Sequence, residues 1–306
     1  MGVVLVTGGA GFIGSQLVRE LSGAGHRVRV LDALTYAGDR AHLIGVPHEF
    51  FHADLQDGAA LRAAMDGADG AIHLAAESHV SRSLASPGAF FATNVEGTRA
   101  VLEAAQAVGL PRLLHMSTDE VFGAALPGQS FGPGDRHRPG NPYAASKAAA
   151  ESLVFAWRHS FGAPVALVRC TNNYGPRQHL EKAIPCWTAM AKNNGLIVIH
   201  GDGSPRRDWL AVEDCARGLR RALEAFEPGA VDHLAGRNER SNRAVAEAVG
   251  ALMGGAPVVS GPARPGQDAA YRLDDRHSRA RLGWRPQVGF AEGLAATVAC
   301  CARRAG

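Results

Sequence analysis

A glycine-rich turn near the N-terminus constrains the fold of this chain more than any other feature. An apolar run, Val3 to Thr7, leads directly into glycines spaced as Gly9-x-Gly11-x-x-Gly14, with Gly8 in a second register, and a helical pattern follows. Glycines at this spacing between a strand and a helix allow a tight turn, and the helix N-terminus attracts a pyrophosphate. The turn predicts a dinucleotide site that contains Gly8, Gly11, Phe12, Ile13 and Gly14.

The first half of the chain alternates between short apolar or β-branched runs and longer helical patterns. This rhythm indicates βαβ units and a doubly wound parallel sheet of the Rossmann type, an α/β fold. The expected strands cover residues 3–7, 27–32, 49–53, 69–75, 112–117 and 165–169. The expected helices cover residues 12–21, 59–65, 90–107 and 143–160.

The second half is less regular and indicates a smaller attached lobe. A chain of 306 residues exceeds the size at which a single core stops growing, about 250 to 300 residues. We predict an NAD-binding Rossmann domain over residues 1–170, to which residues 206–236 return. Residues 171–205 and 237–306 are expected to form an α/β lobe that binds the substrate. Residues 123–140 are rich in Gly and Pro and predict a long loop, a feature often found in lids or binding elements.

Acidic residues after two of the expected strands indicate which dinucleotide binds. Asp32 ends the second strand, where a carboxylate can accept hydrogen bonds from both ribose hydroxyls but would repel a 2′-phosphate. The position therefore favours NAD over NADP. Asp54 and Leu55, after the third strand, are expected to contact the adenine. An Asp at a strand end can equally be only a turn or helix cap.

Composition excludes several other classes of partner. The formal net charge of +3 comes from 32 basic and 29 acidic residues without a basic run, so nucleic acid is not expected. Five cysteines lack the spacing of a disulfide framework or a zinc site, and no metal is expected. The N-terminus has no signal-peptide pattern, and no apolar stretch is long enough to span a bilayer. We therefore expect a cytoplasmic protein without a membrane partner.

Tyr143 and Lys147 form a candidate redox pair. Residues four apart on a helix share one face, which brings an ammonium group near a phenol. A nearby cation can lower the pKa of tyrosine by roughly one to three units, and oxidised nicotinamide would add a second positive charge. The pair thus predicts a base for nicotinamide chemistry, although a surface Tyr and Lys on an ordinary helix is the plain alternative.

Asp119 and Glu120 follow Ser117 and Thr118 at the end of an expected strand. Two carboxylates offer one group to take a proton from carbon and another to protonate a leaving hydroxyl. Consecutive residues of a regular strand point to opposite faces, so both can reach one substrate only if the strand has ended by Thr118. We predict a turn there, helped by Gly123. Otherwise the two carboxylates are merely solvated.

Several motifs together resemble those of the dTDP-glucose 4,6-dehydratases, within the extended short-chain dehydrogenase/reductases. The resemblance runs over nearly the whole chain, and the Thr-Asp-Glu triplet separates this branch from the epimerases and decarboxylases. The motifs are Thr118 to Gly123, Tyr143 to Lys147, Ala76 to Val80, Asp32 to Gly38, Arg169 to Pro176, Glu181-Lys182, Arg207 to Leu210 and Leu282 to Trp284.

The resemblance implies an internal redox cycle. Tyr143 would deprotonate the 4-hydroxyl of the sugar while NAD takes the C4 hydride, with Thr118 bonded to the same oxygen. Glu120 would then remove the C5 proton as Asp119 protonates the 6-hydroxyl, and the hydride would return to C6. Lys147 would also bind the nicotinamide ribose. The product is a 4-keto-6-deoxy sugar.

The resemblance also implies the residues that hold the nucleotide sugar and the oligomeric state. The substrate-binding residues would be Ser78, Asn173, Lys182, Arg207 and Asn242. Plainer roles remain open, since Asn173 could form a turn and Arg207 could simply pair with Asp208. The apolar surface of the expected helices 90–107 and 143–160 fits the homodimer of the family, built through a four-helix bundle. Full burial of that surface within one subunit is the alternative.

Departures from the family pattern gather on the substrate side. They leave the nucleotide and the hexose open and are found at Ser81, Phe122, Cys215, Gln267, Ala269 and Ala270. A 4-epimerase or a uronate decarboxylase would use Tyr143 and NAD without needing Asp119 and Glu120. A non-catalytic NAD-binding regulator would not need the complete set of Thr118, Asp119, Glu120, Tyr143 and Lys147.

Overall fold

A seven-stranded parallel sheet forms the larger part of the molecule. In this computed structural model, which describes residues 1–304, the strand order is β10-β6-β5-β4-β1-β2-β3. All neighbouring strands in it are parallel, so their carboxyl ends lie along one edge. The strands are β1 (Val3–Thr7), β2 (Arg27–Asp32), β3 (Glu49–His52), β4 (Gly70–His73), β5 (Leu113–Thr118), β6 (Val165–Cys170) and β10 (Val231–Leu234).

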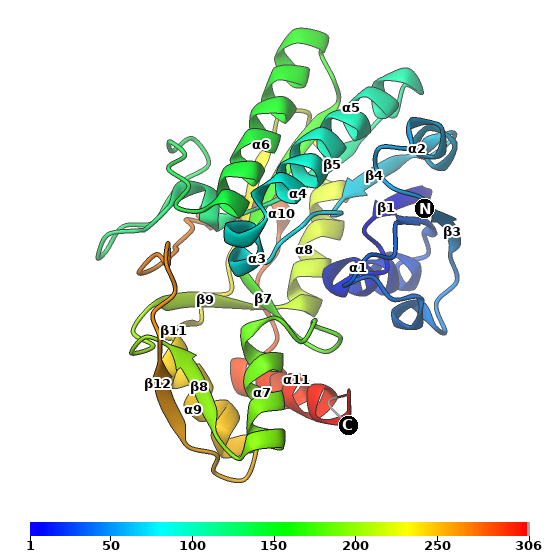
Figure 1. Cartoon of the computed structure of the whole chain (residues 1–306). Helices are drawn as coiled ribbons and strands as arrows, with labels where there is room; N and C mark the ends of the chain where they lie inside the picture. The colour runs from blue at the N-terminus through cyan, green and yellow to red at the C-terminus, as the bar shows by residue number, and fades with distance from the viewer. Residues whose placement is uncertain (305–306) are drawn as a thin grey trace.

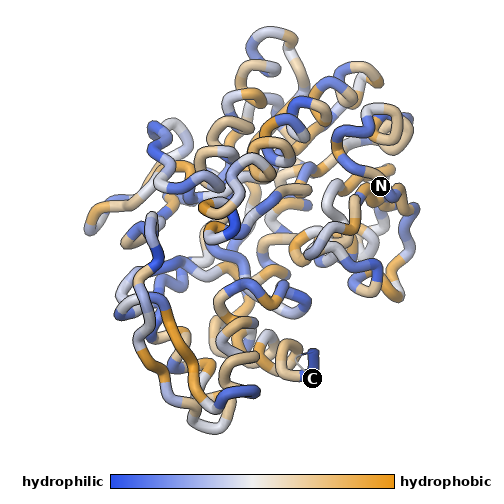
Figure 2. Tube along the Cα trace, viewed as in Figure 1, coloured by the Kyte–Doolittle hydropathy of each residue, from blue (hydrophilic) through white to orange (hydrophobic). Residues whose placement is uncertain are grey.

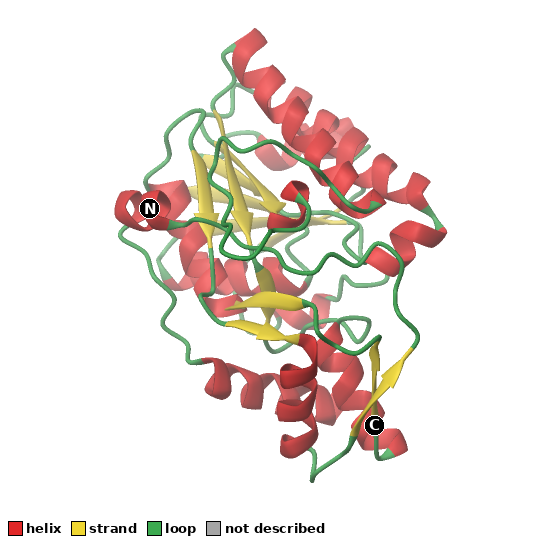
Figure 3. Ribbon diagram, turned by 90° about the vertical axis from the view of Figure 1, so that its left-hand side faces the viewer, coloured by secondary structure: helices red, strands yellow, loops and turns green. Residues whose placement is uncertain are grey.

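Helices cover both faces of this sheet (Figure 3). One face packs against α1 (Phe12–Gly23) and α8 (Val212–Glu224), and the other packs against α2 (Gly58–Met65), α5 (Gly97–Ala107) and α6 (Pro142–Phe161). Side chains of successive strand residues enter opposite cores, as Val4 and Leu5 do. Hydrophobic and hydrophilic positions alternate along α5 and α6 (Figure 2), as expected for helices with one buried face. The predicted doubly wound α/β fold is confirmed.

Two predictions of the secondary structure need correction. The seventh strand, β10, was not expected. The helix expected over 90–107 begins earlier and is interrupted: α4 (Pro87–Phe91) leads into a π-helical turn, Ala92–Glu96, before α5. Pro87 starts α4 because its fixed φ suits the first helical position. A short α3 (Val80–Ala85) precedes it.

A smaller lobe lies below the carboxyl edge of the sheet (Figure 1). Its core, around Trp187, Trp209 and Phe290, joins the helices and strands of this part of the chain. The helices are α7 (Ala183–Asn194), α9 (Asn242–Leu252) and α11 (Phe290–Arg304). The strands are β7 (Asn172–Tyr174), β9 (Arg206–Ala211) and β11 (Glu239–Ser241) in one sheet, and β8 (Ile197–His200) and β12 (Val258–Gly261) in another.

The chain crosses between the two parts more than once. Of the predicted return over 206–236, α8 packs on the large sheet and β10 joins it, whereas β9 pairs with β7 and β11. The last turn of α10 (Arg276–Leu282) also packs on the large domain through Leu282. The domain limits themselves stay predictions. Among residues 1–304, no helix is long and apolar enough to cross a membrane.

A buried ion pair fixes α6, the helix that carries Tyr143, against β6. Arg169 donates from Nε to Glu151 Oε1 at 3.0 Å and from Nη2 to Oε2 at 2.6 Å, and both side chains are almost fully buried. Burial pushes the pKa of Glu151 upward, but hydrogen bonds from His137 and Arg169 outweigh it and hold the pKa at about 2. The contact therefore depends on an ionised carboxylate.

We predict that Glu151→Gln lowers the free energy of unfolding by about 3–5 kcal/mol, because the guanidinium of Arg169 stays buried without its counter-charge. Denaturant unfolding measures this. A folded-state pKa below the ordinary 4.5 means that the contribution is present above pH 4.5 and is lost as the pH falls through about 2. The variant should lack that acid loss. Glu103→Gln, in the exposed pair with Arg99, is the control and should change little.

Candidate functional site

The glycine turn forms a cradle that side chains would fill. Gly8 has φ of +69°, a left-handed conformation, and Gly11 caps α1 without a side-chain bond. A Cβ atom on Gly14 would lie 2.0 Å from the carbonyl oxygen of Gly8, so only glycine fits. The first turn of α1, which includes Phe12 and Ile13, points its free N–H groups toward this cradle. The arrangement suits a pyrophosphate.

Asp32 lies beside this turn at the end of β2. It is buried, and its carboxylate oxygens accept bonds from the backbone N–H groups of Ala10 at 2.9 Å and Leu34 at 2.8 Å. Each oxygen has a further lone pair, so the fixed carboxylate can still accept from ribose hydroxyls. The predicted residues of the cofactor site thus gather at one edge of the sheet.

Asp54 and Leu55 have structural roles in this conformation. Asp54 is exposed and accepts a hydrogen bond from the N–H of Gln56 at 2.9 Å, which is the turn cap considered as the alternative. Leu55 is buried against α5, where a Cβ on Gly97 would come within 2.7 Å of it. Their contact with adenine stays a prediction.

Lys147 and Tyr143 share one face of α6, but their charges differ from the expectation. Lys147 is buried and donates from Nζ to the carbonyl oxygen of Met116 at 2.7 Å, and burial lowers its pKa to about 8. The pKa of Tyr143 is raised well above 10 by burial and then by the charge of Glu120, with only Thr118 acting strongly in the other direction. The predicted lowering of the Tyr143 pKa by Lys147 is therefore wrong for the protein alone, because burial and then the charge of Glu120 raise this pKa.

The predicted turn after Thr118 is present. β5 ends at Thr118, and residues Asp119–Phe122 form a 3-10 helix whose first N–H groups include that of Glu120, bonded to Thr118 Oγ1 at 3.3 Å. Gly123 follows with φ of +72°, and a Cβ there would lie 2.2 Å from the carbonyl oxygen of Arg138. The turn frees the two carboxylates from the alternation of a strand.

Asp119 and Glu120 occupy different environments. Asp119 is 3% exposed, accepts from Thr118 Oγ1 at 3.1 Å, and has a pKa raised well above its ordinary value by burial and by Glu120. This upward shift of the pKa favours the protonated acid, the form that can give a proton. Glu120 is half-buried and accepts from Asn141 Nδ2 at 3.1 Å and from the hydroxyl of Tyr271 at 3.4 Å. One group can donate and the other can accept.

The predicted substrate-binding residues are brought together only in part. Lys182 donates from Nζ to the carbonyl oxygen of Ser78 at 2.8 Å and to its hydroxyl at 3.1 Å, which joins the smaller lobe to the loop after β4. Arg207 lies over the ring of Tyr271 at 4.4 Å, beside Glu120, and makes no ion pair with Asp208.

The two predicted asparagines donate to backbone carbonyl groups of the protein. Asn173 turns its amide to the carbonyl oxygen of Thr171 at 3.1 Å and keeps Oδ1 buried without a partner among residues 1–304. Asn242 begins α9, next to β11, and its backbone N–H bonds to Pro205. Their contacts with substrate stay predictions.

Three residues of this cleft were missed by the sequence analysis. Arg264 is half-buried, has an Nε atom without a partner in the described chain, and senses the charges of Glu120, Arg207 and Tyr271. It lies in the less regular second half of the chain, three residues before Gln267, and no motif singled it out. Asn141 and Tyr271, the two donors to Glu120, were not predicted as site residues.

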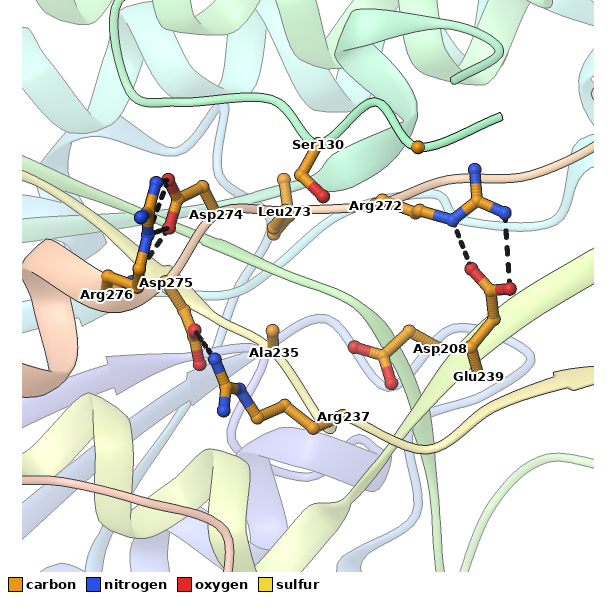
Figure 4. Close-up of a pocket in the computed structure, with 11 residues that line it drawn as sticks. Ser130, Asp208, Ala235, Arg237, Glu239, Arg272, Leu273, Asp274, Asp275 and Arg276 are labelled. Carbon is orange, nitrogen blue, oxygen red and sulfur yellow. Dashed lines mark hydrogen bonds and ion pairs between the residues drawn. The ribbon is translucent and has the colours of Figure 1, made fainter. Parts of the chain in front are cut away.

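A cavity of about 520 Å³ lies near β9 and β11 but outside this cleft. Its charged side chains pair with one another, as Arg272 with Glu239 and Arg276 with Asp274 (Figure 4). No predicted catalytic residue lines it. The candidate site therefore lies at the carboxyl edge of the sheet, around Asp119, Glu120 and Tyr143.

Comparisons with known proteins agree with this geometry. Residues 4–234 match the NAD dependent epimerase/dehydratase family. A dTDP-glucose 4,6-dehydratase of Streptomyces niveus is 40% identical over 307 residues, covering 96% of this chain and 91% of that protein. The crystal structure of DesIV, a dTDP-glucose 4,6-dehydratase of Streptomyces venezuelae with NAD bound, has a TM-score of 0.94 at 39% identity, covering 99% and 97%. A UDP-glucose 4-epimerase of Thermus thermophilus with NAD has a TM-score of 0.89 at 33% identity, covering 98% of each chain.

We predict that Gly14→Ala removes measurable dinucleotide binding, because the added Cβ would meet the Gly8 carbonyl at 2.0 Å and open the turn. Isothermal titration with NAD checks this. Gly23→Ala is the matched control in the same helix, since a Cβ there meets nothing within 4 Å. Normal binding by Gly14→Ala would mean that the pyrophosphate does not use this turn.

Proposed function

The chain belongs to the NAD dependent epimerase/dehydratase family, and from that premise we propose that it is a nucleotide-sugar 4,6-dehydratase. Its substrate is dTDP-glucose or a close relative, and its cofactor is NAD. The observation that supports this proposal best is the turn after Thr118, after which Asp119 is buried with a raised pKa and Glu120, hydrogen-bonded by Asn141, acts on the pKa of Tyr143.

The residues of the cleft divide the reaction between them. Tyr143 takes the proton of the sugar's 4-hydroxyl, and Thr118 bonds the same oxygen. The 4-ketone then acidifies C5, so Glu120 removes that proton while the C6–O bond breaks and Asp119 protonates the departing oxygen as water. The double bond left between C5 and C6 takes up a hydride at C6 and a proton at C5.

The Gly8–Gly14 cradle, Asp32 and Lys147 would hold NAD, which would accept the hydride from C4 and later supply it to C6. Tyr143 alone keeps its proton, since burial and Glu120 raise its pKa. A positive charge on the oxidised ring would lower the pKa of Tyr143 and so favour the phenolate, the form that can accept a proton. The cofactor would thus lower the pKa of Tyr143, an effect that was expected from Lys147.

Positive charge in the cleft supports a diphosphate substrate. Lys182, Arg207 and Arg264 approach from three segments, and a lowered pKa of Arg264 from burial and the neighbouring Arg207 indicates closely spaced cations. Guanidinium groups bind phosphate oxygens in a bidentate manner. These three side chains and Ser78, Asn173 and Asn242 form the proposed binding set.

The proposal extends to oligomeric state and compartment. Phe91 and Phe155 are 42% and 41% exposed on α4 and α6, an apolar surface suited to a homodimer through a four-helix bundle. All five cysteines are free thiols, which supports the cytoplasm.

The alternatives on the same fold are a 4-epimerase and a uronate decarboxylase, and neither needs Asp119 and Glu120. Incubation with NAD and dTDP-, UDP-, CDP- and GDP-glucose, followed by mass spectrometry, should show loss of one water from at least one sugar. An unchanged mass with inverted C4 would identify an epimerase. NAD binding without turnover of any nucleotide sugar would favour a regulator.

We predict that Glu120→Gln blocks dehydration while bound NAD is still reduced, because the amide cannot accept the C5 proton. Absorbance of the reduced cofactor should rise and persist. Glu247→Gln, an exposed substitution on α9, should turn over like the parent. Equal turnover by Glu120→Gln would remove Glu120 from the mechanism.

We predict that Phe155→Asp converts the dimer into monomers, because a carboxylate cannot be buried unpaired in a helical interface. Light scattering after gel filtration measures the mass. Leu252→Asp, at a site 49% exposed on α9 of the smaller lobe, should keep the mass of the parent. A monomeric parent protein would exclude the homodimer.

A further inference from the structure

Asn141 connects the two halves of the cleft through one side chain. Its Oδ1 atom accepts the N–H of Ala144 at 2.9 Å and so caps the helix that carries Tyr143. Its Nδ2 atom donates to Glu120 Oε2 at 3.1 Å. The side chain is buried, so both bonds are shielded from water.

An amide suits this position better than other good helix caps. Asn, Asp and Ser cap helices about equally well, because each offers an oxygen to the first N–H groups. Asparagine alone carries its donor on a separate atom, so the cap and the bond to Glu120 do not compete. Aspartate would cap α6 equally but would place a second carboxylate against Glu120.

The amide is also the nearer of the two donors to this oxygen. The hydroxyl of Tyr271 lies 3.4 Å from Glu120 Oε2 but 2.9 Å from Asp268 Oδ2, and its single hydrogen can serve only one of them well. Among residues 1–304, Glu120 Oε1 makes no hydrogen bond within the protein. Asn141 therefore holds one oxygen and leaves the other to act on the substrate.

We propose that Asn141 is a positioning residue, which sets Glu120 at a fixed distance from Tyr143 so that the C5 base and the C4 base address neighbouring carbons of one sugar. The proposal rests on the dehydratase function proposed above. It assigns Asn141 no contact with the substrate. Its role is expressed mainly in the dehydration half of the reaction, in which Glu120 removes the proton, whereas C4 oxidation responds to Glu120 only through the charge that raises the pKa of Tyr143.

The test compares Asn141→Ser and Asn141→Asp in the full-length enzyme with the nucleotide sugar that the parent turns over. Stopped-flow absorbance of the reduced cofactor gives the rate of C4 oxidation, and mass spectrometry of quenched samples gives the rate of water loss. Thermal unfolding reports the helix cap. Asp57→Ala, which removes the cap of α2, is the control for a lost cap elsewhere.

We expect Asn141→Ser to reduce the cofactor at a rate within about twofold of the parent and to lose water about 10- to 100-fold more slowly, since misplacement of a catalytic group by about 1 Å has effects of that size. Reduced cofactor should then accumulate. Asn141→Asp should be slower still in water loss, although its cap is as good. Asp57→Ala should lower the melting temperature without accumulating reduced cofactor.

A purely structural role of Asn141 predicts the reverse order, with Asn141→Asp close to the parent and any loss shared equally by the two half-reactions. Either that order or equal loss would overturn the proposal, as would unchanged water loss in both variants. Failure of the parent to dehydrate any nucleotide sugar would be a separate result against the proposed function, seen before any variant is compared.

Discussion

The end of β5 at Thr118 is the constraint on which the rest of the site depends. A strand that continued for two more residues would send Asp119 and Glu120 to opposite faces of the sheet. The 3-10 helix prevents this, and Gly123, with its left-handed backbone, lets the chain pass close to Arg138. Because the sheet is parallel, the same edge also receives the glycine turn after β1, so carboxylates and cofactor cradle meet without any long-range adjustment.

Two adjacent carboxyl groups acquire different chemistry from their surroundings alone. Asp119 is buried beside the negative charge of Glu120, and both raise its pKa. Glu120 sits a residue further out, with an amide and a phenol directed at one of its oxygens. Separation of an acid from a base by environment is a general device of active sites. Here the turn geometry creates both environments at once.

The fold could be predicted from sequence because apolar runs and glycines act locally. β10 was missed because Asp232 and His233 interrupt its apolar pattern, although tertiary contacts bury both. The turn at Thr118 followed from the required chemistry. The pKa of Tyr143 did not, since burial and the approach of Glu120 are properties of the folded chain. The same reason explains why the sequence did not predict Asn141, Arg264 and Tyr271. Each of them acts on a residue that is distant in the sequence.

The ammonium group of Lys182 is already bonded to Ser78, and this bond joins the smaller lobe to the loop after β4. In the proposed role of Lys182, an arriving diphosphate would replace these protein contacts with its own, and the gain in affinity would be the difference between the two sets. Such an exchange would make diphosphate binding weaker than binding to an unbonded ammonium group. It would also avoid the entropy cost of ordering the loop that contains Ser78 when the ligand binds. The bond from Lys182 to Ser78 would thus lower the affinity for the nucleotide while keeping the site ordered before binding. Lower affinity would favour release of a product that carries the same nucleotide as the substrate.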